Sequence, residues 1–165
     1  MQKWRIGEVT VTKIVELETT GGSRFILPQA TREACIGIGW MRPHFMDDEG
    51  RLKMSIHALV VETPARRIVV DTCLGNDKQG RSVPTWNGLQ GPFLRDLAAA
   101  GFARESIDTV LCTHLHVDHV GWNTMLVGGR WVPTFPNARY LMGRTEFEYW
   151  RSKRDHAEQS SVFDD

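Results

Sequence analysis

The stretch from Asp108 to His119 reads DTVLCTHLHVDH and joins a predicted strand to a dense group of polar side chains. Its first half is a short apolar run, which is typical of a buried strand. Its second half carries His114, His116, Asp118 and His119, whose nitrogen and oxygen atoms are the ligands that zinc prefers. Packing such groups together is costly unless a cation lies between them. The stretch therefore predicts a metal site with hydrolytic chemistry, and the alternative is an ordinary polar loop.

The expected geometry of the cluster suggests two ions. The cluster follows the carboxyl end of the strand, where sites of layered α/β proteins usually form. In an extended backbone His114 and His116 point the same way and can bind one ion together. Asp118 and His119 follow at a turn or a helix start and can bind a second ion. Two ions about 3.5–4 Å apart can hold a bridging hydroxide and polarise a substrate oxygen, with the pKa of the bound water near ~7.

Composition narrows the class of protein. The chain has 165 residues, 41% of them hydrophobic and 24% charged, which predicts one soluble globular domain spanning residues 1–165. Twenty basic and twenty acidic residues balance, so we expect no nucleic-acid partner. No apolar run is long enough for a bilayer, and no signal core opens the sequence, so we expect no membrane partner. Three cysteines without a Cys-x-x-Cys motif favour a reduced, cytoplasmic setting, with Cys112 a core residue.

The rest of the sequence predicts alternating strands and helices, which is a mixed α and β class. Residues 20–54 and 72–91 are expected to be mostly loop. Thr145 and Glu148 fit a capping box that would open a helix ending near Lys153. The other expected elements are a hairpin over residues 3–18 turning at Gly7-Glu8, strands 55–63, 67–71 and 138–142, a helix 93–100 closed by Gly101, and a hairpin turning at 128–130.

Two segments resemble a known family. The segment THLHVDHVG, from Thr113 to Gly121, resembles the His-x-His-x-Asp-His signature of the metallo-β-lactamase superfamily. The segment IVVDTCLG, from Ile68 to Gly75, resembles its V-D-T-G element, with Cys73 where glycine is commoner. Shorter pieces resemble the branch of N-acyl-homoserine-lactone lactonases and methyl-parathion-hydrolase-like enzymes; they are GNDK at 75–78, WN at 122–123 and FPNA at 135–138.

This resemblance implies a fold and a set of roles. The fold would be α/β (α+β), the amino-terminal half of an αββα sandwich. His114 and His116 would bind the first zinc ion, and Asp118 and His119 the second. Asp118 would also orient the attacking hydroxide as a catalytic residue. Asp71 would orient the loop backbone or the ligands, although a strand-end Asp that caps a turn fits its position as well.

The resemblance also implies ligands that this sequence lacks. The family pattern has a further histidine in a Gly-His-Thr-like segment downstream, then a bridging Asp and a last histidine, and the sequence ends at Asp165 before them. The other histidines, His44, His57 and His156, match no ligand position and are expected to be core-facing or solvated. We therefore expect an incomplete domain that binds zinc weakly, hydrolyses little by itself, and exposes an apolar sheet face that favours self-association.

The predicted function is metal-dependent hydrolysis of a small-molecule lactone or related ester by a metal-activated hydroxide. Trp86 and Trp122 could line the substrate pocket, although core packing is the alternative for each. Three loop cations, Arg42, Lys78 and Arg81, are expected to be solvated. Phosphotriester and β-lactam hydrolysis remain open within the enzyme class. A truncated, non-catalytic metal-binding fragment is the alternative from another class.

Overall fold

The structure is a computed structural model that describes residues 2–153 and 161–163. The chain divides into two compact units, which we call the large unit (residues 1–16 and 57–165) and the small unit (residues 17–56). His156 lies outside the described residues, so its expected solvated position stays a prediction.

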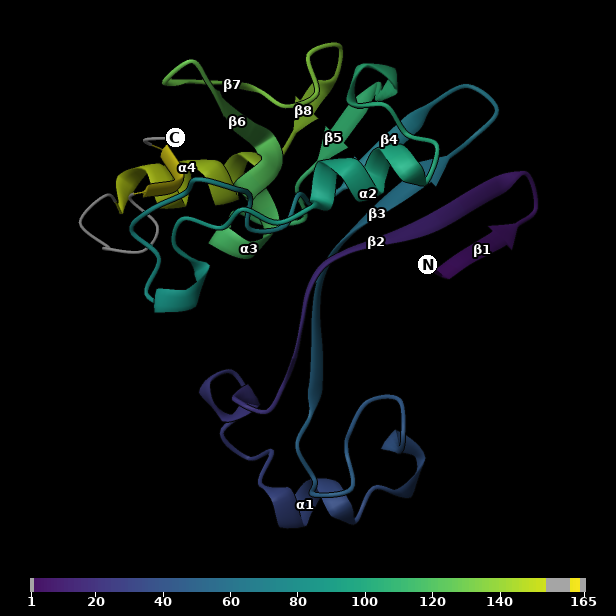
Figure 1. Cartoon of the computed structure of the whole chain (residues 1–165), viewed down its shortest axis with the longest axis vertical. Coiled ribbons are helices and arrows are strands. Elements are labelled where there is room, and N and C mark those ends of the chain that lie inside the picture. The colour runs from purple at the N-terminus through teal and green to yellow at the C-terminus, as the bar shows by residue number, and fades with distance from the viewer. Residues whose placement is uncertain (1, 154–160, 164–165) are drawn as a thin grey trace. The chain divides into compact units, whose positions relative to one another are not determined.

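The main feature is a six-stranded sheet in the order β1-β2-β3-β4-β5-β8 (Figure 1). The β1–β2 and β3–β4 pairs are antiparallel, whereas β4–β5 and β5–β8 are parallel. The strands are β1 Gln2–Ile6, β2 Val9–Thr20, β3 Lys53–Glu62, β4 Arg67–Val70, β5 Thr109–Leu111 and β8 Arg139–Leu141. A separate antiparallel hairpin consists of β6 Thr124–Val127 and β7 Arg130–Pro133. These strands confirm the mixed α+β class.

The helices are short. They are α1 Arg32–Ile36, α2 Phe93–Ala99, α3 Val117–Val120 and α4 Arg144–Ser152, with 3-10 turns η1 Ser23–Phe25, η2 Gly39–Met41, η3 Pro84–Trp86, η4 Arg104–Ser106, η5 Gly121–Asn123 and η6 Ser161–Phe163. The predicted end of α2 is confirmed, because Gly101 has a φ of 96°, which favours glycine. No helix in the described part of the chain has the length and the apolar character that a membrane span needs.

The predicted capping box at the start of α4 is wrong. The helix begins at Arg144, and Gly143 occupies the N-cap position without a side-chain hydrogen bond. Thr145 therefore lies inside the first turn, where its side chain cannot cap the helix. The sequence pattern placed the helix start two residues too late, because it could not show that the extended backbone before the helix ends at Gly143.

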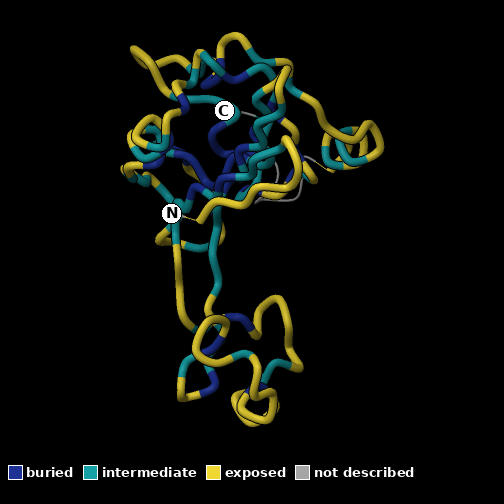
Figure 2. The backbone as a smooth tube through the Cα atoms, turned by 90° about the vertical axis from the view of Figure 1, so that its right-hand side faces the viewer, coloured by how far each residue is buried: buried dark blue, intermediate teal, exposed yellow. Residues whose placement is uncertain are grey.

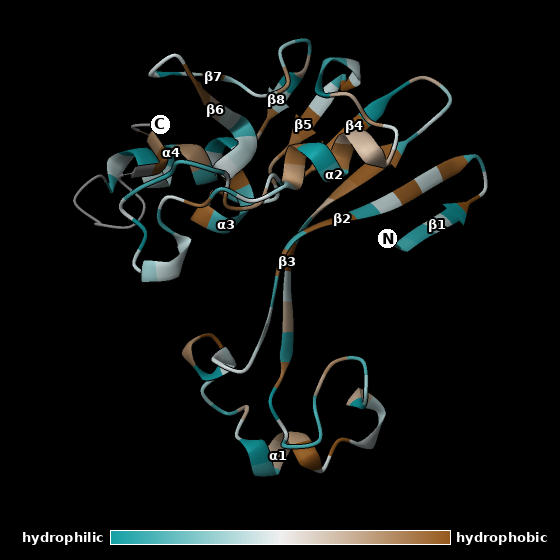
Figure 3. Cartoon of the chain, viewed as in Figure 1, coloured by the Kyte–Doolittle hydropathy of each residue, from teal (hydrophilic) through white to brown (hydrophobic). Residues whose placement is uncertain are grey.

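The core of the large unit lies along the central strands. Val60 of β3, Val69 of β4 and Val110 of β5 are completely buried, as is Phe93 of α2. Figure 2 shows the buried segments of this unit gathered in and around these strands. Hydrophobic and hydrophilic residues alternate along β2 in Figure 3, and its two buried side chains, Thr12 and Ile14, lie on one face. The buried valines of β4 and β5, Val69 and Val110, pair in the parallel register, whereas Leu111 of β5 is exposed.

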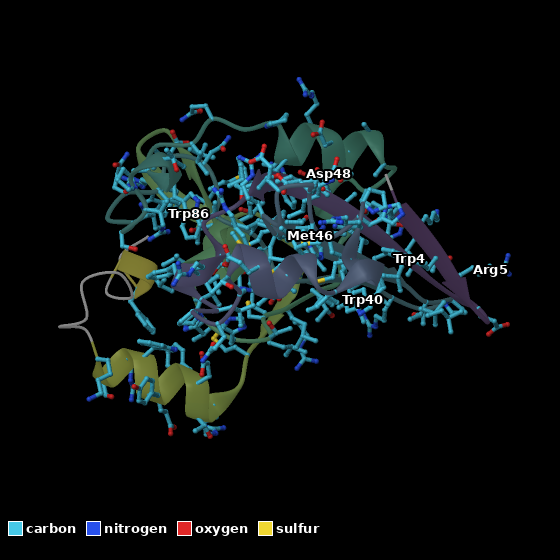
Figure 4. The ribbon with its side chains drawn as sticks, turned by 90° about the horizontal axis from the view of Figure 1, so that it is seen from below. Trp4, Arg5, Trp40, Met46, Asp48 and Trp86 are labelled. Atoms are coloured by element: carbon cyan, nitrogen blue, oxygen red, sulfur yellow. The ribbon has the colours of Figure 1, made fainter. Side chains whose placement is uncertain are left out.

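The small unit is mostly irregular, as the sequence predicted. The Thr31 side chain caps α1 by accepting a hydrogen bond from the Ala34 N–H at 3.2 Å. Asp47 stabilises a turn by accepting hydrogen bonds from the N–H groups of Glu49 and Arg51 at 3.0 and 2.8 Å. Met46 is fully buried within this unit (Figure 4).

Candidate metal centre

The cluster lies just past the end of β5 and runs into α3. Leu115 and Val117 are buried, so the residues between and beside them are turned away from the core. His116 takes the N-cap position of α3 with an extended backbone, and the helix then carries Asp118 and His119. An extended segment followed by one helical turn therefore brings the four predicted ligands to the same end of the strand.

The four predicted ligands lie close to one another. The ring centroids of His114 and His116 are 4.6 Å apart, and those of His114 and His119 are 3.9 Å apart. His119 Nε2 lies 3.5 Å from a carboxylate oxygen of Asp118. His116 is exposed, and the other three side chains are half-buried, so the cluster is open to a ligand from solvent.

Asp71, at the end of β4, connects the cluster to the strand before it. Its carboxylate accepts hydrogen bonds from the Thr113 N–H at 2.8 Å and from His119 Nδ1 at 2.8 Å. The hydroxyl of Thr113 also donates to it at 2.8 Å. The backbone φ of Asp71 is 56°, a left-handed conformation that aspartate tolerates better than most residues. Asp71 therefore contacts both the loop backbone and one predicted ligand.

These contacts determine which ring nitrogens carry protons. An ionised carboxylate only accepts hydrogen bonds, so His119 Nδ1 must donate to Asp71. The single hydroxyl proton of Thr113 is also donated to Asp71, so the hydroxyl accepts from His114 Nδ1, 3.0 Å away. In both histidines the Nε2 atom is then the one available to a cation, as in metal sites where a second partner holds the other nitrogen. Thr113 was not predicted from the sequence; its place directly before the first histidine was the available signal.

The charges around His119 favour a cation. Burial lowers the pKa of His119, but the hydrogen bonds and negative charges of Asp118 and Asp71 outweigh it and raise this pKa to about 9. Burial raises the pKa of Asp118, yet the contact with His119 holds it below its ordinary value. The pKa of His114 is lowered by burial and by the neighbouring positive charges of His119 and His116. Without a metal the site thus holds a proton on His119 that a divalent cation would displace.

The donor set fits a metal such as zinc. Three imidazoles and a carboxylate lie together. The partners on Nδ1 leave Nε2 as the ligating nitrogen of His114 and His119, and in His119 the cation would displace the Nε2 proton. Among residues 2–153 and 161–163, however, no group of three or more His, Cys, Asp or Glu side chains is arranged to hold one ion. The metal assignment of His114, His116, Asp118 and His119 therefore stays a prediction.

The segment after β4 packs directly against the cluster. The Thr72 N–H donates to the His119 carbonyl at 2.7 Å, and the Gly121 N–H donates to the Cys73 carbonyl at 2.7 Å. A Cβ on Gly121 would lie 1.8 Å from the carbonyl oxygen of Leu74, so only glycine fits there. The two segments that carried the family resemblance therefore lie side by side.

The two candidate pocket residues differ in position. Trp122 is buried, its ring stacks on Phe93 with centroids 5.6 Å apart, and its Nε1–H donates to Glu16 at 2.6 Å. Trp86 is half-buried in η3 within the 72–91 loop (Figure 4). Trp122 thus packs in the core, which was the alternative to a pocket role. The pocket role of both residues stays a prediction.

Two of the three loop cations were predicted wrongly. Arg42 is exposed as expected, but Lys78 and Arg81 are only 1% and 5% exposed. Lys78 Nζ donates to Thr124 Oγ1 at 2.6 Å and lies 3.6 Å from the ring centroid of Trp131. A long side chain can bury its carbon stem while its charge finds a hydroxyl and an aromatic face, and such partners are distant in sequence.

Helix α4 also reaches the cluster, which the sequence did not indicate. The Leu115 N–H donates to Glu146 Oε1 at 3.0 Å. The Trp150 ring lies beside His116 with centroids 5.6 Å apart. Glu146 and Trp150 are four residues apart on α4, and this spacing, which places them on one helix face, was the available signal.

Comparison with known proteins places this geometry in a family. Residues 53–163 match the sequence profile of the Metallo-beta-lactamase superfamily. No curated protein matches the chain. The structure resembles that of a probable metal-dependent hydrolase from Staphylococcus aureus, with a TM-score of 0.71 and 19% identity over 94% of this chain and 55% of that one.

Two further solved structures share the fold. AidC, described as a dizinc quorum-quenching lactonase in complex with a product, has a TM-score of 0.66 and 22% identity over 90% of this chain and 46% of that one. A variant of B. thuringiensis AiiA with N-decanoyl-L-homoserine bound at its active site has a TM-score of 0.53 and 18% identity over 86% of this chain and 51% of that one. The chain thus spans about half the length of these proteins. Because the matched profile covers more than half of its residues, the chain belongs to the metallo-beta-lactamase superfamily.

Proposed function

We propose that this chain belongs to a metal-dependent hydrolase in which His114 and His116 bind one zinc ion and Asp118 and His119 bind a second. The observation that carries the proposal is the arrangement of Asp71 and Thr113. Their contacts occupy Nδ1 of His119 and His114, which leaves Nε2 of each histidine for a cation. Zinc ions bound there would supply a nucleophile at neutral pH and polarise the substrate oxygen.

The residues of the chain have distinct roles in this proposal. The Asp118 carboxylate lies beside His119 Nε2 and serves both as a ligand and as the acceptor that orients the attacking water. Asp71 holds His119 and the Thr113 backbone in place. Of the two candidate tryptophans, the half-buried Trp86 contributes to the wall of the substrate pocket. Gly121 allows the 72–75 backbone to pack closely against the cluster.

We further propose that the substrate is a lactone or a related ester. AidC and the AiiA variant, which share the fold, hold a lactonase product and an N-acyl-homoserine respectively. Phosphotriesters and β-lactams use the same kind of nucleophile, so a panel of the three substrate classes distinguishes them. The three cysteines of the described chain are free and buried, which supports our expectation of a cytoplasmic protein.

Calorimetric titration with zinc tests the proposal. We expect the chain to bind up to two ions weakly, because it offers two ligands to each ion instead of the usual three. His114→Ala should reduce both the affinity and the number of ions bound, since it removes one of two ligands. His44→Ala, an exposed histidine of the small unit, is the matched control and should bind as the wild type does.

The outcomes separate the alternatives. Unchanged zinc binding in His114→Ala would refute the ligand assignment. Tight binding of two ions would show that the chain needs no further ligands. Zinc binding without turnover of a lactone, a phosphotriester or a β-lactam, by the chain or by a longer form of the protein, would favour the non-catalytic metal-binding alternative.

A further inference from the structure

Helix α4 holds the backbone between the two predicted ligands of the first ion. The N–H of Leu115 donates to Glu146 Oε1 at 3.0 Å. The side chain of Leu115 is buried in the core, with 3% exposed. Leu115 is therefore fixed on both sides, by the core through its side chain and by Glu146 through its amide. These contacts also restrain the backbone of the adjacent residues, His114 and His116.

The same helix contacts the side chain of one ligand. Trp150 Nε1–H donates to Glu146 Oε1 at 2.8 Å, so one carboxylate oxygen accepts from both Trp150 and Leu115. The Trp150 ring then lies against His116, with centroids 5.6 Å apart and an angle of 65° between the planes. Glu146 thus orients the indole that borders the His116 imidazole.

The contact of α4 with Leu115 is a polar one. No residue of α4, Arg144–Ser152, is fully buried, and Glu146, Phe147 and Trp150 are half-buried. The hydrogen bond to Leu115 is a specific polar contact with a segment 31 residues away. It reaches the N–H of Leu115, the residue that lies between two predicted ligands of the same ion.

We propose that Glu146 is a positioning residue of the metal centre. It fixes the Leu115 peptide and the Trp150 ring so that the His114 and His116 imidazoles stay together, 4.6 Å apart, before an ion arrives. This inference rests on the proposed function, because it assumes that the two histidines bind a metal. Outer partners that orient ligands commonly change metal affinity about 10–100-fold when they are removed.

Three substitutions at Glu146 separate the effect of its side-chain length from the effect of its negative charge. Glu146→Gln keeps an oxygen at the same reach and removes the charge. Glu146→Asp keeps the charge but is one methylene shorter and cannot reach the Leu115 amide without a shift. Glu146→Ala removes both. Glu148→Ala, an exposed carboxylate on the same helix, is the matched control.

The measurements are the zinc dissociation constant, the visible absorption spectrum of the cobalt-substituted chain, and the thermal unfolding temperature in the presence of a chelator. We expect Glu146→Ala and Glu146→Asp to weaken zinc binding about tenfold or more and to alter the cobalt spectrum. Glu146→Gln should stay close to the wild type in both, and Glu148→Ala should match it. The unfolding temperatures in chelator identify any general loss of stability.

Each outcome decides the inference. If the wild type binds zinc and Glu146→Ala binds it equally well, the inference is overturned while the proposed function stands. An equal loss in Glu148→Ala also overturns it, because the effect would belong to the helix as a whole. If Glu146→Ala does not fold, the other two variants decide. Equal zinc affinities of Glu146→Gln and Glu146→Asp overturn the inference, and a loss of zinc affinity in Glu146→Asp alone supports it. If the wild type binds no zinc, the proposed function fails first.

Discussion

At the residue scale, Asp71 makes the most hydrogen bonds to the candidate metal centre that we describe. Its carboxylate accepts from the backbone of Thr113, from the hydroxyl of Thr113 and from the ring of His119. The hydroxyl in turn accepts from His114. One carboxylate therefore orients two of the predicted ligands, one directly and one through Thr113. Both sequence interpretations of Asp71 agree with these contacts, since it also holds the backbone at the end of its strand.

The pKa of His119 predicts how the metal-free chain responds to pH. This pKa is raised from 6.5 to about 9 in the folded chain. A histidine whose pKa is higher in the folded chain stabilises the fold when it is protonated. This stabilisation is complete below the pKa of the unfolded chain and is lost as the pH rises through the pKa of the folded chain. We therefore expect the free energy of unfolding to fall by about 1–3 kcal/mol between pH 6.5 and 9. Urea unfolding in the presence of a chelator measures it.

Asp71→Asn tests whether the raised pKa of His119 causes this loss of stability. The variant removes one of the two carboxylates that raise the pKa of His119, so the fall in stability over this pH range should shrink. Asp48→Asn, an exposed aspartate of the small unit, should leave it unchanged. A wild type whose stability is constant over this range would contradict the assignment.

At the element scale, strand β2 supports the backbone beside the cluster through Glu16. The Glu16 carboxylate accepts from the N–H groups of Leu74 and Gly75 at 2.7 and 3.2 Å, and from Trp122 Nε1 at 2.6 Å. Burial raises the pKa of Glu16 despite these three hydrogen bonds. Glu16 of β2 thus bonds both to the segment after β4 and to Trp122, which lies just after α3.

Glu16→Ala should destabilise the large unit. It leaves the buried Leu74 N–H and the Trp122 indole N–H without their acceptor, and an unsatisfied buried donor costs about 1–3 kcal/mol. Glu18→Ala, an exposed glutamate on the same strand, should change the free energy of unfolding by less than about 0.5 kcal/mol. Urea unfolding of both variants at neutral pH measures the difference. Equal values for the two would show that Glu16 has no supporting role.

The elements themselves were largely predictable. The apolar runs predicted β3, β4 and β5, and the Gly128-Gly129 turn predicted the β6–β7 hairpin, because each signal lies within a few consecutive residues. The start of α4 was misplaced, since a capping pattern does not show where the preceding strand ends. The burial of Lys78 was missed because its partners, Thr124 and Trp131, lie more than forty residues away.

At the scale of the whole molecule, the exposed edge of the sheet predicts self-association. Leu111 of β5 and Leu141 of β8 face each other in the parallel register and are 39% and 42% exposed. The two leucines therefore form one exposed apolar patch. We expect the chain to associate at rising concentration through this patch, as followed by sedimentation velocity.

Leu141→Ser should weaken this association, because it removes one of the two leucines of the patch. Val127→Ser, which changes an apolar residue of β6 that is 51% exposed, is the control and should associate as the wild type does. A chain that sediments as a monomer at every concentration would contradict the prediction, and an equal effect of both substitutions would place the contact elsewhere.

The sequence alone determined the family and the position of the predicted metal ligands. The four donor residues lie within six positions directly after an apolar strand, so local pattern was enough to identify them. Tertiary structure decided how these donors are held. The parallel pairing of Val70 with Leu111 brings Asp71 beside Thr113, and α4 brings Glu146 to Leu115. Such hydrogen bonds join residues that are 31 to 48 positions apart, and their partners are set by strand register and helix placement, which no short stretch of sequence contains.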